Sequence, residues 1–526
     1  MRGSTLSGMT IGDRLKIGAV FARTLATPIE RPDRLPKALK AMAPWGSNTA
    51  GLVAGAAARY PDRIAIHDDD GTITYAELWA RSQSIAQALA ADGVGPGTGV
   101  GLLARDHRGF VATLTAVAAT GADLVLLNTG FAGPQLTDVV EAENITLVVH
   151  DDEFTDVVAA SGVRNIDEAE LEAMASTPDA TVATRKEQGR VVILTSGTTG
   201  RPKGAARSSD PSAVVGIAAL LDRIPLRLGD TQIIAAPMFH SWGLSHLLLG
   251  LSRCSVNIVS RRFDPASTLE QLQTHRPQVL VVVPVMLARM LAADDSPSLA
   301  NPELRVIASS GSAIGSRLTT EVLDRFGPVL YNLYGSTEVA AATIATPADL
   351  QQAPNTAGRV PFGVKVEILD DDGNPLPEGD IGRIFVGGAM RFDGYTDGNN
   401  KEQQRGLLSS GDVGYFRDGL LFVEGRDDDM IVSGGENVFP NEVEELLQHH
   451  DDIADVAVVG VPDDEFGQAL AAFVVLADGA DLDEAAVRDH VRSNLARHKI
   501  PRQVHFLDEL PRNPTGKVLR RVLAES

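Results

Sequence analysis

The chain has 526 residues, of which 44% are hydrophobic and 22% charged, and its formal net charge is −22. A chain of this length exceeds what one hydrophobic core serves, so at least two domains are expected. The acidic balance argues against nucleic acid as a partner, because phosphate binding requires a basic surface. The single cysteine, Cys254, excludes an intrachain disulfide and a Cys-rich metal site, and we expect it to be a small buried hydrophobe.

Residues 1–47 form a basic leader, since positions 1–45 hold eight Lys/Arg and three Asp/Glu. The leader lacks the charged, apolar and small-residue succession of a secretory signal, so a cytoplasmic location is expected. Its apolar residues, which include Ile17, Phe21 and Trp45, allow two interpretations. One is a weak contact with a membrane surface, and the other is packing against the acidic remainder of the chain. Assembly into a homo-oligomer is also left open.

From residue 48 the sequence alternates helical and strand-like patterns, which is typical of α/β layers. Thr74 and Glu77 form a capping box, which opens a helix with Leu78, Ile85 and Leu89 on one face. Short, continuously apolar runs predict buried strands and favour parallel pairing. These strands are expected at 100–103, 124–127, 145–149 and 191–194 and between Pro277 and Val283.

After about residue 356 the pattern changes to hairpin-like pieces, with turns at 371–375 and 417–419, and indicates a separate β-rich layer. The polar segment 425–429 is the expected hinge. Beyond it, a helix from Pro440, strands at 454–461 and 471–476 and a helix that carries Val487 and Val491 predict a small α+β domain. The expected domains are therefore 48–426 and 427–526.

The strongest local signal for chemistry is the segment 194–204, which follows the strand-like run 191–193. Its hydroxyls and glycines can bind phosphate oxygens, and a lysine supplies compensating charge. The pattern differs from a Walker loop, because Pro202 and Gly204 stand where that loop has Gly and Ser/Thr. A flexible surface turn is the alternative. The candidate phosphate ligands are Thr195, Ser196, Gly197, Thr198, Thr199, Gly200 and Lys203.

The segment resembles the phosphate-binding signature of the adenylate-forming superfamily, which includes the bacterial fatty acyl-CoA synthetases. Further segments resemble that superfamily in the same order, namely 237–240, 310–313, 334–338, 410–412, 425–426, 433–437 and 514–517, so the resemblance spans roughly residues 48–521. It implies an α/β fold with a large N-terminal domain, built from two α/β layered subdomains and a β-rich subdomain, and a small mobile C-terminal α+β domain. It also implies ATP, Mg²⁺ and CoA as cofactor and co-substrates.

The resemblance assigns the nucleotide site. Gly311, Ser312 and Ala313 lie along adenine, while Tyr334, Gly335, Ser336 and Thr337 contact the purine and the α-phosphate. Asp412 accepts hydrogen bonds from the ribose hydroxyls, and Arg426 bridges ribose or phosphate oxygens. Thr198 and Glu338 are the metal ligands. The alternatives are structural: a helix cap for Glu338, a turn for Asp412 and a hinge contact for Arg426.

Three further groups complete the expected chemistry by resemblance. Lys517 is the catalytic cation, which offsets the repulsion between a carboxylate and the α-phosphate. His240 lies near the carboxylate, and Ser433, Gly434, Gly435 and Glu436 approach the CoA thiol after the small domain rotates about Asp428. A solvated tail lysine and a core histidine are the respective alternatives. His240 and His246 lack metal-ligand spacing, so zinc is not expected.

Apolar neighbours such as Trp242 and Leu244 favour a hydrophobic acid, and a medium- or long-chain fatty acid is the first expectation. An aryl acid, a carrier protein as acyl acceptor, a luciferase-like oxygenase and a non-catalytic nucleotide sensor are the alternatives. Two positions depart from the family pattern, Ser409-Ser410 before the aspartate and His498 before Lys499-Ile500-Pro501. These departures concern thiol binding and leave the expected adenylation unaffected.

Overall fold

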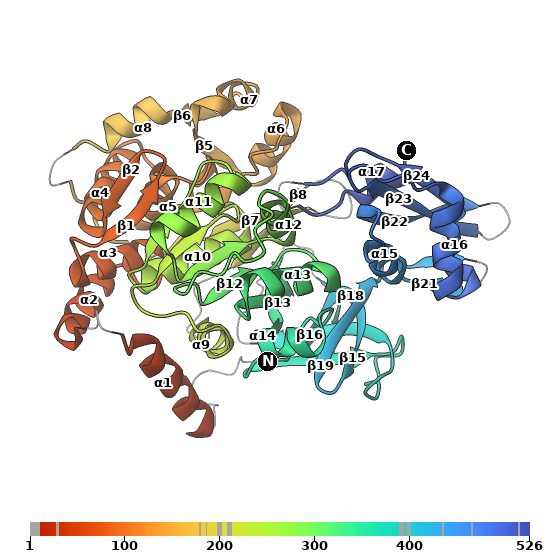
Figure 1. The fold of residues 1–526 in the computed structure, drawn as a ribbon. Helices are drawn as coiled ribbons and strands as arrows, with labels where there is room; N and C mark the ends of the chain where they lie inside the picture. The colour runs from red at the N-terminus through yellow and green to blue at the C-terminus, as the bar shows by residue number, and fades with distance from the viewer. Residues whose placement is uncertain are drawn as a thin grey trace.

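The computed structural model describes residues 11–27, 31–177, 180–185, 187–196, 202–207, 213–388, 394, 396, 401–433, 436–463, 467–513 and 516–525. The structure has two mixed α/β sheets, a β-rich sheet and a small α+β unit (Figure 1). The strands of one α/β sheet, β3 to β8, lie between β2 and β9 of the other in the chain, and the β-rich sheet and the α+β unit follow both. The expected α/β fold is confirmed, and so is its division into a large N-terminal and a small C-terminal part. Within the described residues, no helix has the length and apolarity needed to cross a membrane.

The larger α/β sheet has eight strands in the order β14-β13-β12-β11-β9-β10-β1-β2. Its six central strands pair in parallel, and β14 and β2 close the edges in antiparallel pairing. The expected parallel pairing is therefore present. The strands are β1 (Ile64–Asp68), β2 (Gly71–Thr74), β9 (Thr231–Ile234), β10 (Val256–Ile258), β11 (Val279–Val282), β12 (Val306–Ser309), β13 (Leu330–Ser336) and β14 (Ala340–Ala345).

The second α/β sheet has six strands in the order β6-β5-β3-β4-β7-β8, parallel except for the last. Side chains alternate between its two faces: Leu124 and Leu126 enter the core shared with the larger sheet, and Val125 packs with the helices α6 and α7 on the other face. The strands are β3 (Gly99–Leu103), β4 (Asp123–Leu126), β5 (Ile145–His150), β6 (Arg164–Ile166), β7 (Val191–Ser196) and β8 (Pro202–Arg207).

Helices cover both α/β sheets, and the shared core contains residues of α3, α4, α5, α10 and α12. The expected capping box is present at α4, where the Thr74 hydroxyl accepts the Glu77 N–H and the Glu77 carboxylate accepts the Thr74 N–H. The helices of this part are α1 (Ile11–Leu25), α2 (Leu35–Met42), α3 (Thr49–Arg59), α4 (Tyr75–Ala91), α5 (Arg108–Thr120), α6 (Gly133–Ala142), α7 (Thr155–Ala159), α8 (Glu168–Met174), α9 (Ala213–Arg223), α10 (Ser241–Ser252), α11 (Pro265–His275), α12 (Pro284–Ala292), α13 (Ser316–Phe326) and α14 (Pro347–Gln352).

The predicted β-rich layer is an antiparallel sheet of five strands. At one of the predicted turns, Asp418 and Gly419 both have positive φ angles, which is the geometry of a tight hairpin turn. The strands are β15 (Val364–Leu369), β16 (Gly382–Gly388), β17 (Gln403–Gln404), β18 (Leu407–Arg417) and β19 (Leu420–Arg426).

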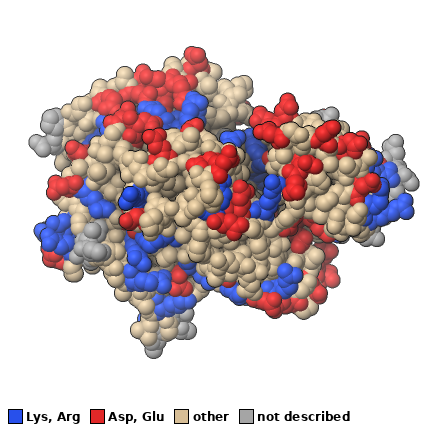
Figure 2. Space-filling model, in the orientation of Figure 1, with Lys and Arg blue, Asp and Glu red and all other residues tan. Residues whose placement is uncertain are grey.

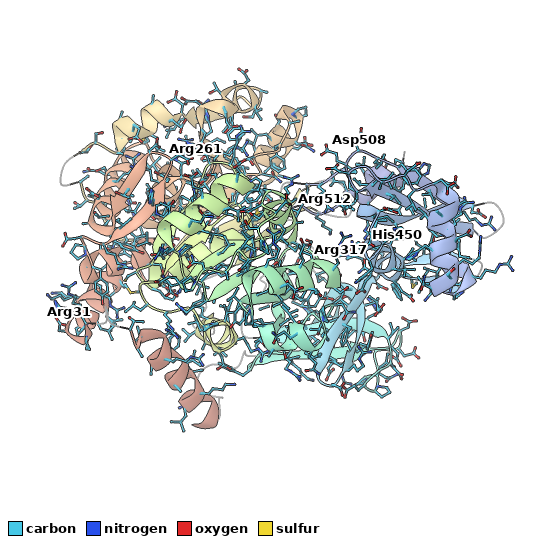
Figure 3. All side chains as sticks on the ribbon, viewed as in Figure 1. Arg31, Arg261, Arg317, His450, Asp508 and Arg512 are labelled. Carbon is cyan, nitrogen blue, oxygen red and sulfur yellow. The ribbon has the colours of Figure 1, made fainter. Side chains whose placement is uncertain are left out.

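The small C-terminal part has its own sheet and its own hydrophobic core. It meets the large part at α13, where the Arg317 guanidinium donates to the carbonyls of Gln448 (2.8 Å) and Ile453 (2.9 Å). Figure 3 shows Arg317 at this junction, close to His450. Its elements are β20 (Ile431–Ser433), β21 (Glu436–Val438), α15 (Pro440–Gln448), β22 (Ile453–Asp463), β23 (Gly467–Leu476), α16 (Glu484–Asn494), β24 (Gln503–Phe506) and α17 (Arg520–Ala524).

Candidate active site

The segment 334–338 ends strand β13 and forms the turn into β14, not the start of a helix. Gly335 is required there, because a Cβ atom would collide with the carbonyl oxygen of Ala340. The Ser336 hydroxyl donates to the Glu338 carboxylate (2.7 Å), and Glu338 is only 9% exposed. The structure therefore rejects a helix cap as the role of Glu338. Its carboxylate is a hard oxygen donor of the kind that Mg²⁺ accepts, so the residues present fit such an ion.

Asp412 connects this turn to the β-rich sheet. The Tyr334 hydroxyl donates to its carboxylate at 2.5 Å, and Arg426 lies beside it, with its Nε 3.8 Å from the other carboxylate oxygen. Burial raises the pKa of Asp412, whereas the hydrogen bond from Tyr334 and the charges of Arg426 and Lys517 oppose this rise. Three residues that the sequence assigned to one nucleotide site therefore meet, although they come from two sheets.

Lys517 approaches the same group from the small domain. Its backbone N–H donates to the Asn513 side chain (2.9 Å), and Gly516 has a φ of +78°. Gly516 packs so closely on Val285 at the start of α12 that a Cβ atom there would collide with the valine. The loop thus docks on the large domain, and the Lys517 side chain is exposed, with its charge acting on Asp412.

The loop 310–315, between β12 and α13, carries the expected adenine segment Gly311, Ser312 and Ala313. It runs beside β13, since the Ser310 hydroxyl donates to the carbonyl of Leu333 (2.8 Å). Position 311 favours glycine because its φ is +100°, a backbone conformation that residues with a Cβ atom rarely adopt. The segment therefore begins beside Leu333, the residue before Tyr334, and its place along adenine stays a prediction.

His240 stands directly before α10 and packs against Phe239, with ring centroids 4.3 Å apart. Burial lowers the pKa of His240 to about 4, so its imidazole is neutral at pH 7. Its Nε2 is buried and has no hydrogen-bond partner among the described residues. A neutral ring that carries its proton on the unused Nε2 can donate a hydrogen bond to a bound carboxylate, and it adds no positive charge.

Asp106 is a functional candidate that the sequence did not reveal. Its carboxylate is buried and accepts the backbone N–H of Met238 at 3.0 Å, which fixes the loop that carries His240. Burial raises its pKa to about 8. Because 132 positions separate the two partners, no local pattern could have indicated the contact.

The phosphate-binding candidates Thr195, Ser196 and Lys203 lie at the end of the β7–β8 hairpin, where Thr195 pairs with Lys203. Ser433 and Glu436 pair in a second hairpin, β20–β21, at one edge of the small domain's sheet. The Lys517 loop lies by the other edge, since Arg512 donates to Asp455 of β22 (2.6 Å). The two groups of the small domain are therefore on different sides of it. Gly197, Thr198, Thr199, Gly200, Gly434 and Gly435 lie outside the described residues.

A cavity of about 300 Å³ lies beside the contact between the Lys517 loop and the large domain, and residues of both domains line it. Figure 2 shows Lys and Arg side chains in the recess between the two domains, and Figure 3 shows Arg512 at this junction. Asp106 and Phe239 line it from the large domain, and Asn513 and Gly516 line it from the small domain. The arginines of its lining are Arg105, Arg261, Arg262, Arg289 and Arg512.

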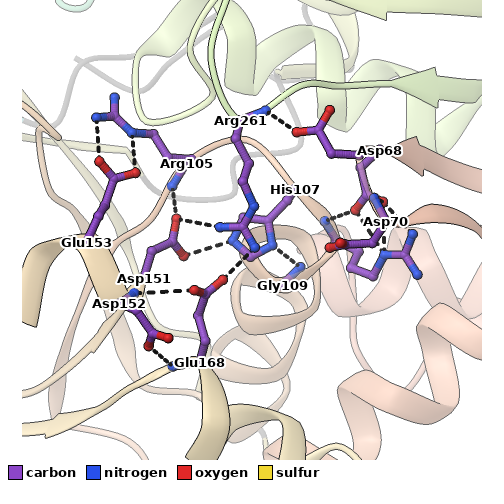
Figure 4. A network of polar contacts seen from close by, with 12 residues as sticks. Asp68, Asp70, Arg105, His107, Gly109, Asp151, Asp152, Glu153, Glu168 and Arg261 are labelled. Atoms are coloured by element: carbon purple, nitrogen blue, oxygen red, sulfur yellow. Dashed lines mark hydrogen bonds and ion pairs between the residues drawn. The ribbon is translucent and has the colours of Figure 1, made fainter.

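A polar network holds two of these arginines (Figure 4). Arg105 pairs with Glu153 through two contacts of 3.0 Å, and Arg261 pairs with Asp151 (3.3 Å) and Glu168 (2.5 Å). His107 Nδ1 accepts the N–H of Gly109, so the neutral ring carries its proton on Nε2 and donates it to Asp151. Although His107, Asp151 and Glu168 are close enough to hold a metal ion, Arg261 already pairs with both carboxylates. The cluster therefore has a structural role, because its contacts connect strands to loops.

Comparison with known proteins agrees with this geometry. The family model of the AMP-binding enzymes matches residues 53–396, and that of their C-terminal domain matches residues 442–517. The chain is 33% identical to an indoleacetate–CoA ligase of Aromatoleum aromaticum, over 90% of this chain and 96% of that protein. It is 32% identical to a 2-succinylbenzoate–CoA ligase of Geobacillus kaustophilus, over 88% and 95% of the two chains.

Among solved structures, the fold is similar to that of o-succinylbenzoate CoA synthetase from Bacillus subtilis in complex with its acyl-adenylate, with a TM-score of 0.82. That match has 27% identity and covers 90% of this chain and 98% of the other. The fold and the site thus define an adenylate-forming enzyme of the acid–thiol ligase class, with ATP, Mg²⁺ and CoA as its cofactor and co-substrates. The chain belongs to the AMP-binding enzyme family.

Proposed function

We propose that this ligase activates an aromatic or arylalkyl carboxylic acid with ATP, giving an acyl-adenylate and pyrophosphate, and then transfers the acyl group to CoA with release of AMP. The observation that carries the proposal is the docking of the Lys517 loop on the large domain, with the lysine charge acting on the Tyr334–Asp412 pair. This is the arrangement that the first half-reaction needs. Attack of a carboxylate on the α-phosphate brings anions together, and a positioned cation offsets their repulsion.

Each site residue then has a separate task. Tyr334 and the segment Gly311, Ser312 and Ala313 border adenine, Asp412 accepts the ribose hydroxyls, and Arg426 keeps that carboxylate in place. Glu338 and Thr198 would hold Mg²⁺, which offsets phosphate charge when it is bound. His240 donates a hydrogen bond to the acid's carboxylate, and its neutral ring leaves the nucleophile's charge unaltered.

The second half-reaction requires another face of the small domain. Ser433, Glu436 and the two glycines between them are proposed to approach the pantetheine thiol after the small domain rotates about 427–429. The thiol sulfur then attacks the acyl carbonyl carbon, the bond to the phosphate oxygen breaks, and AMP leaves. The separation of the β20–β21 hairpin from the Lys517 loop supports this division of work.

The acid class is supported by the named relatives. The indoleacetate and 2-succinylbenzoate ligases act on acids that contain a ring. Val339, Ala340 and Ala341 follow Glu338 and line an apolar cavity of about 20 Å³, with Ala219 and Leu220 of α9 opposite them. That volume is room for about one water molecule, so the proposed acid class rests on the named relatives. A medium- or long-chain fatty acid, the expectation from the sequence, is the second candidate, because the same apolar lining suits an alkyl chain.

The test is pyrophosphate release with Mg-ATP for benzoate, phenylacetate, indoleacetate, octanoate and palmitate, each with and without CoA. The expected result is release with the ring-containing acids and a CoA thioester as product, and the Lys517→Ala variant is the control for enzymatic origin. Preference for octanoate or palmitate would refute the proposed acid class. Acyl transfer to a phosphopantetheinylated carrier protein in place of CoA would refute the proposed acceptor.

A further inference from the structure

The N-terminal helix α1 packs on α9 of the large domain through one of its faces. Ile17 and Val20 are buried, and Ile17 belongs to a small hydrophobic cluster with Val215 and Ala218 of α9. The match to the family model begins at residue 53, so α1 lies outside it. One side of the leader thus packs on its own domain, which is one of the two interpretations that its sequence allowed.

The opposite face of α1 is apolar and exposed. Leu15, Gly18, Ala19 and Ala22 recur at the spacing that places residues on one side of a helix, and all four are exposed. Leu15 is 70% exposed, and a Cβ atom at Gly18 would meet no other atom within 4 Å. The outward side of a surface helix usually carries polar and charged residues instead. We call these four residues the outer stripe of α1.

Positive charges border the outer stripe. The side chains of Lys16 and Arg23 are 48% and 55% exposed, although both pair with Asp222. Long basic side chains can lay their methylene stems along apolar material while the charged group stays in a polar layer. Helix α1 therefore combines an apolar face with flanking cations, which is the composition of helices that lie in the interface of a membrane.

Helix α2 has the same combination on its outward side. Leu35 and Leu39 are four positions apart and 37% and 58% exposed, and Lys37 and Lys40 are exposed beside them. Ala38, on the inward side, is buried. Of the eight large hydrophobic side chains that are exposed in the described part of the chain, three belong to α1 and α2. Exposed apolar surface is therefore concentrated in these two helices.

The two helices lie at the end of the molecule that is far from the small domain (Figure 1). Figure 2 shows Lys and Arg side chains gathered over α2, at the left of the molecule. Positions 1–45 hold eight Lys/Arg and three Asp/Glu, whereas the whole chain has a net charge of −22. An anionic surface is therefore attracted by the leader and repelled by the rest of the chain, so only one orientation of the enzyme suits it.

We propose that the outer stripe of α1 and the outward side of α2, with Leu35 and Leu39, form a docking surface for a membrane that contains anionic lipids. The apolar side chains enter the boundary between headgroups and acyl chains, and the lysines and arginines meet the lipid phosphates. A lipid surface follows the outline of two separate helices, whereas a protein partner would need a shape that matches both. Because the docking surface lies far from the small domain, docking leaves the proposed rotation of that domain free.

The test is flotation of the full-length enzyme with vesicles of phosphatidylcholine mixed with phosphatidylglycerol, and with vesicles of phosphatidylcholine alone. We expect binding to the anionic vesicles only, and release at high salt, because salt screens attraction between exposed charges. The double variant Lys37→Gln/Lys40→Gln should bind about 25-fold more weakly, since each cation near an anionic surface contributes about fivefold. Leu15→Ala should bind about tenfold more weakly, because alanine offers less apolar surface to the lipid.

Two variants outside the leader are matched controls. Ile381→Ala removes an aliphatic side chain that is 51% exposed, and Lys365→Gln removes an exposed cation, so both should bind vesicles like the unaltered enzyme. All variants should release pyrophosphate at the unaltered rate in solution, which shows that they fold. The inference is overturned if the enzyme does not bind anionic vesicles at low salt, binds both kinds of vesicle equally, or binds equally well after the leader substitutions. A dimer that Leu15→Ala abolishes, without vesicle binding, would assign the outer stripe to a second copy of the chain.

Discussion

Replacing Asp106 by asparagine tests whether this residue, which is buried behind the loop that carries His240, is a neutral carboxylic acid. Burial raises the pKa of Asp106 from its ordinary 3.8 to about 8, and the nearby charge of Asp151 adds to the rise. The Met238 N–H and Arg105 favour the charged form and limit the shift. At pH 7 the folded enzyme therefore holds this residue as a neutral acid. Asparagine has nearly the same shape and still accepts the Met238 N–H.

The sign of the effect follows from proton uptake. Between about pH 4 and pH 8 the folded state keeps a proton on Asp106 that the unfolded chain has lost, so stability falls as the pH rises. The rise of this pKa from 3.8 to about 8 corresponds to at most about 6 kcal/mol, which is reached above pH 8. The asparagine side chain cannot ionise, so Asp106→Asn should be more stable than the unaltered enzyme at about pH 8 to 9, and the difference should shrink as the pH falls toward about 4.

The assay is the unfolding temperature of both proteins across this pH range, together with infrared detection of the protonated carboxyl group. A carboxyl band that titrates near pH 8 and is missing in Asp106→Asn is expected. The control is Asp106→Ala, which leaves the buried Met238 N–H without an acceptor and should be about 1–3 kcal/mol less stable than Asp106→Asn at every pH. Parallel stability curves for Asp106→Asn and the unaltered enzyme would refute a neutral Asp106.

Three other substitutions address the proposed roles directly. Lys517→Ala should slow pyrophosphate release about 10²- to 10³-fold but spare thioester formation from supplied acyl-adenylate, and unimpaired release would remove Lys517 from the first step. Asp412→Ala should weaken ATP binding in calorimetric titration, so an unchanged affinity would argue against its ribose contact. Gly335→Ala should lower both the unfolding temperature and the activity, because its Cβ collides with the carbonyl of Ala340; normal behaviour of this variant would contradict the geometry of the turn.

The sequence predicted those features that depend on local pattern. The capping box at Thr74 and the hairpin turn at Asp418 are short-range devices, and both are present where expected. The continuous apolar runs correctly indicated buried parallel strands, because such strands are covered on both faces. Ordered motifs placed Tyr334 and Asp412 in one site, and the structure brings them into a hydrogen bond.

Contacts between segments that lie far apart in the chain could not be predicted from sequence patterns. The pairing of Asp106 with Met238 and the packing of Ile17 on α9 join positions that no periodicity relates. The basic leader illustrates the difficulty, since the same residues suit a membrane surface and an acidic protein surface equally. Lys16 lies near Asp222 only because the chain folds back on itself. Which of the two surfaces the leader contacts therefore depends on tertiary structure.

The position of Gly516 explains why one arrangement cannot perform both half-reactions. Its contact with Val285 holds the Lys517 loop on the large domain, and the Arg317 contacts with Gln448 and Ile453 fix the small domain in the same orientation. In that orientation the edge of the small sheet near Asp455 lies by the Lys517 loop, and the β20–β21 edge is on the other side of the small domain. The proposed approach of Ser433 to the adenylate would break these contacts, so the proposed catalytic lysine, Lys517, would leave as the thiol site forms. We place the rotation of the small domain at the proposed hinge, residues 427–429, which directly follow Arg426.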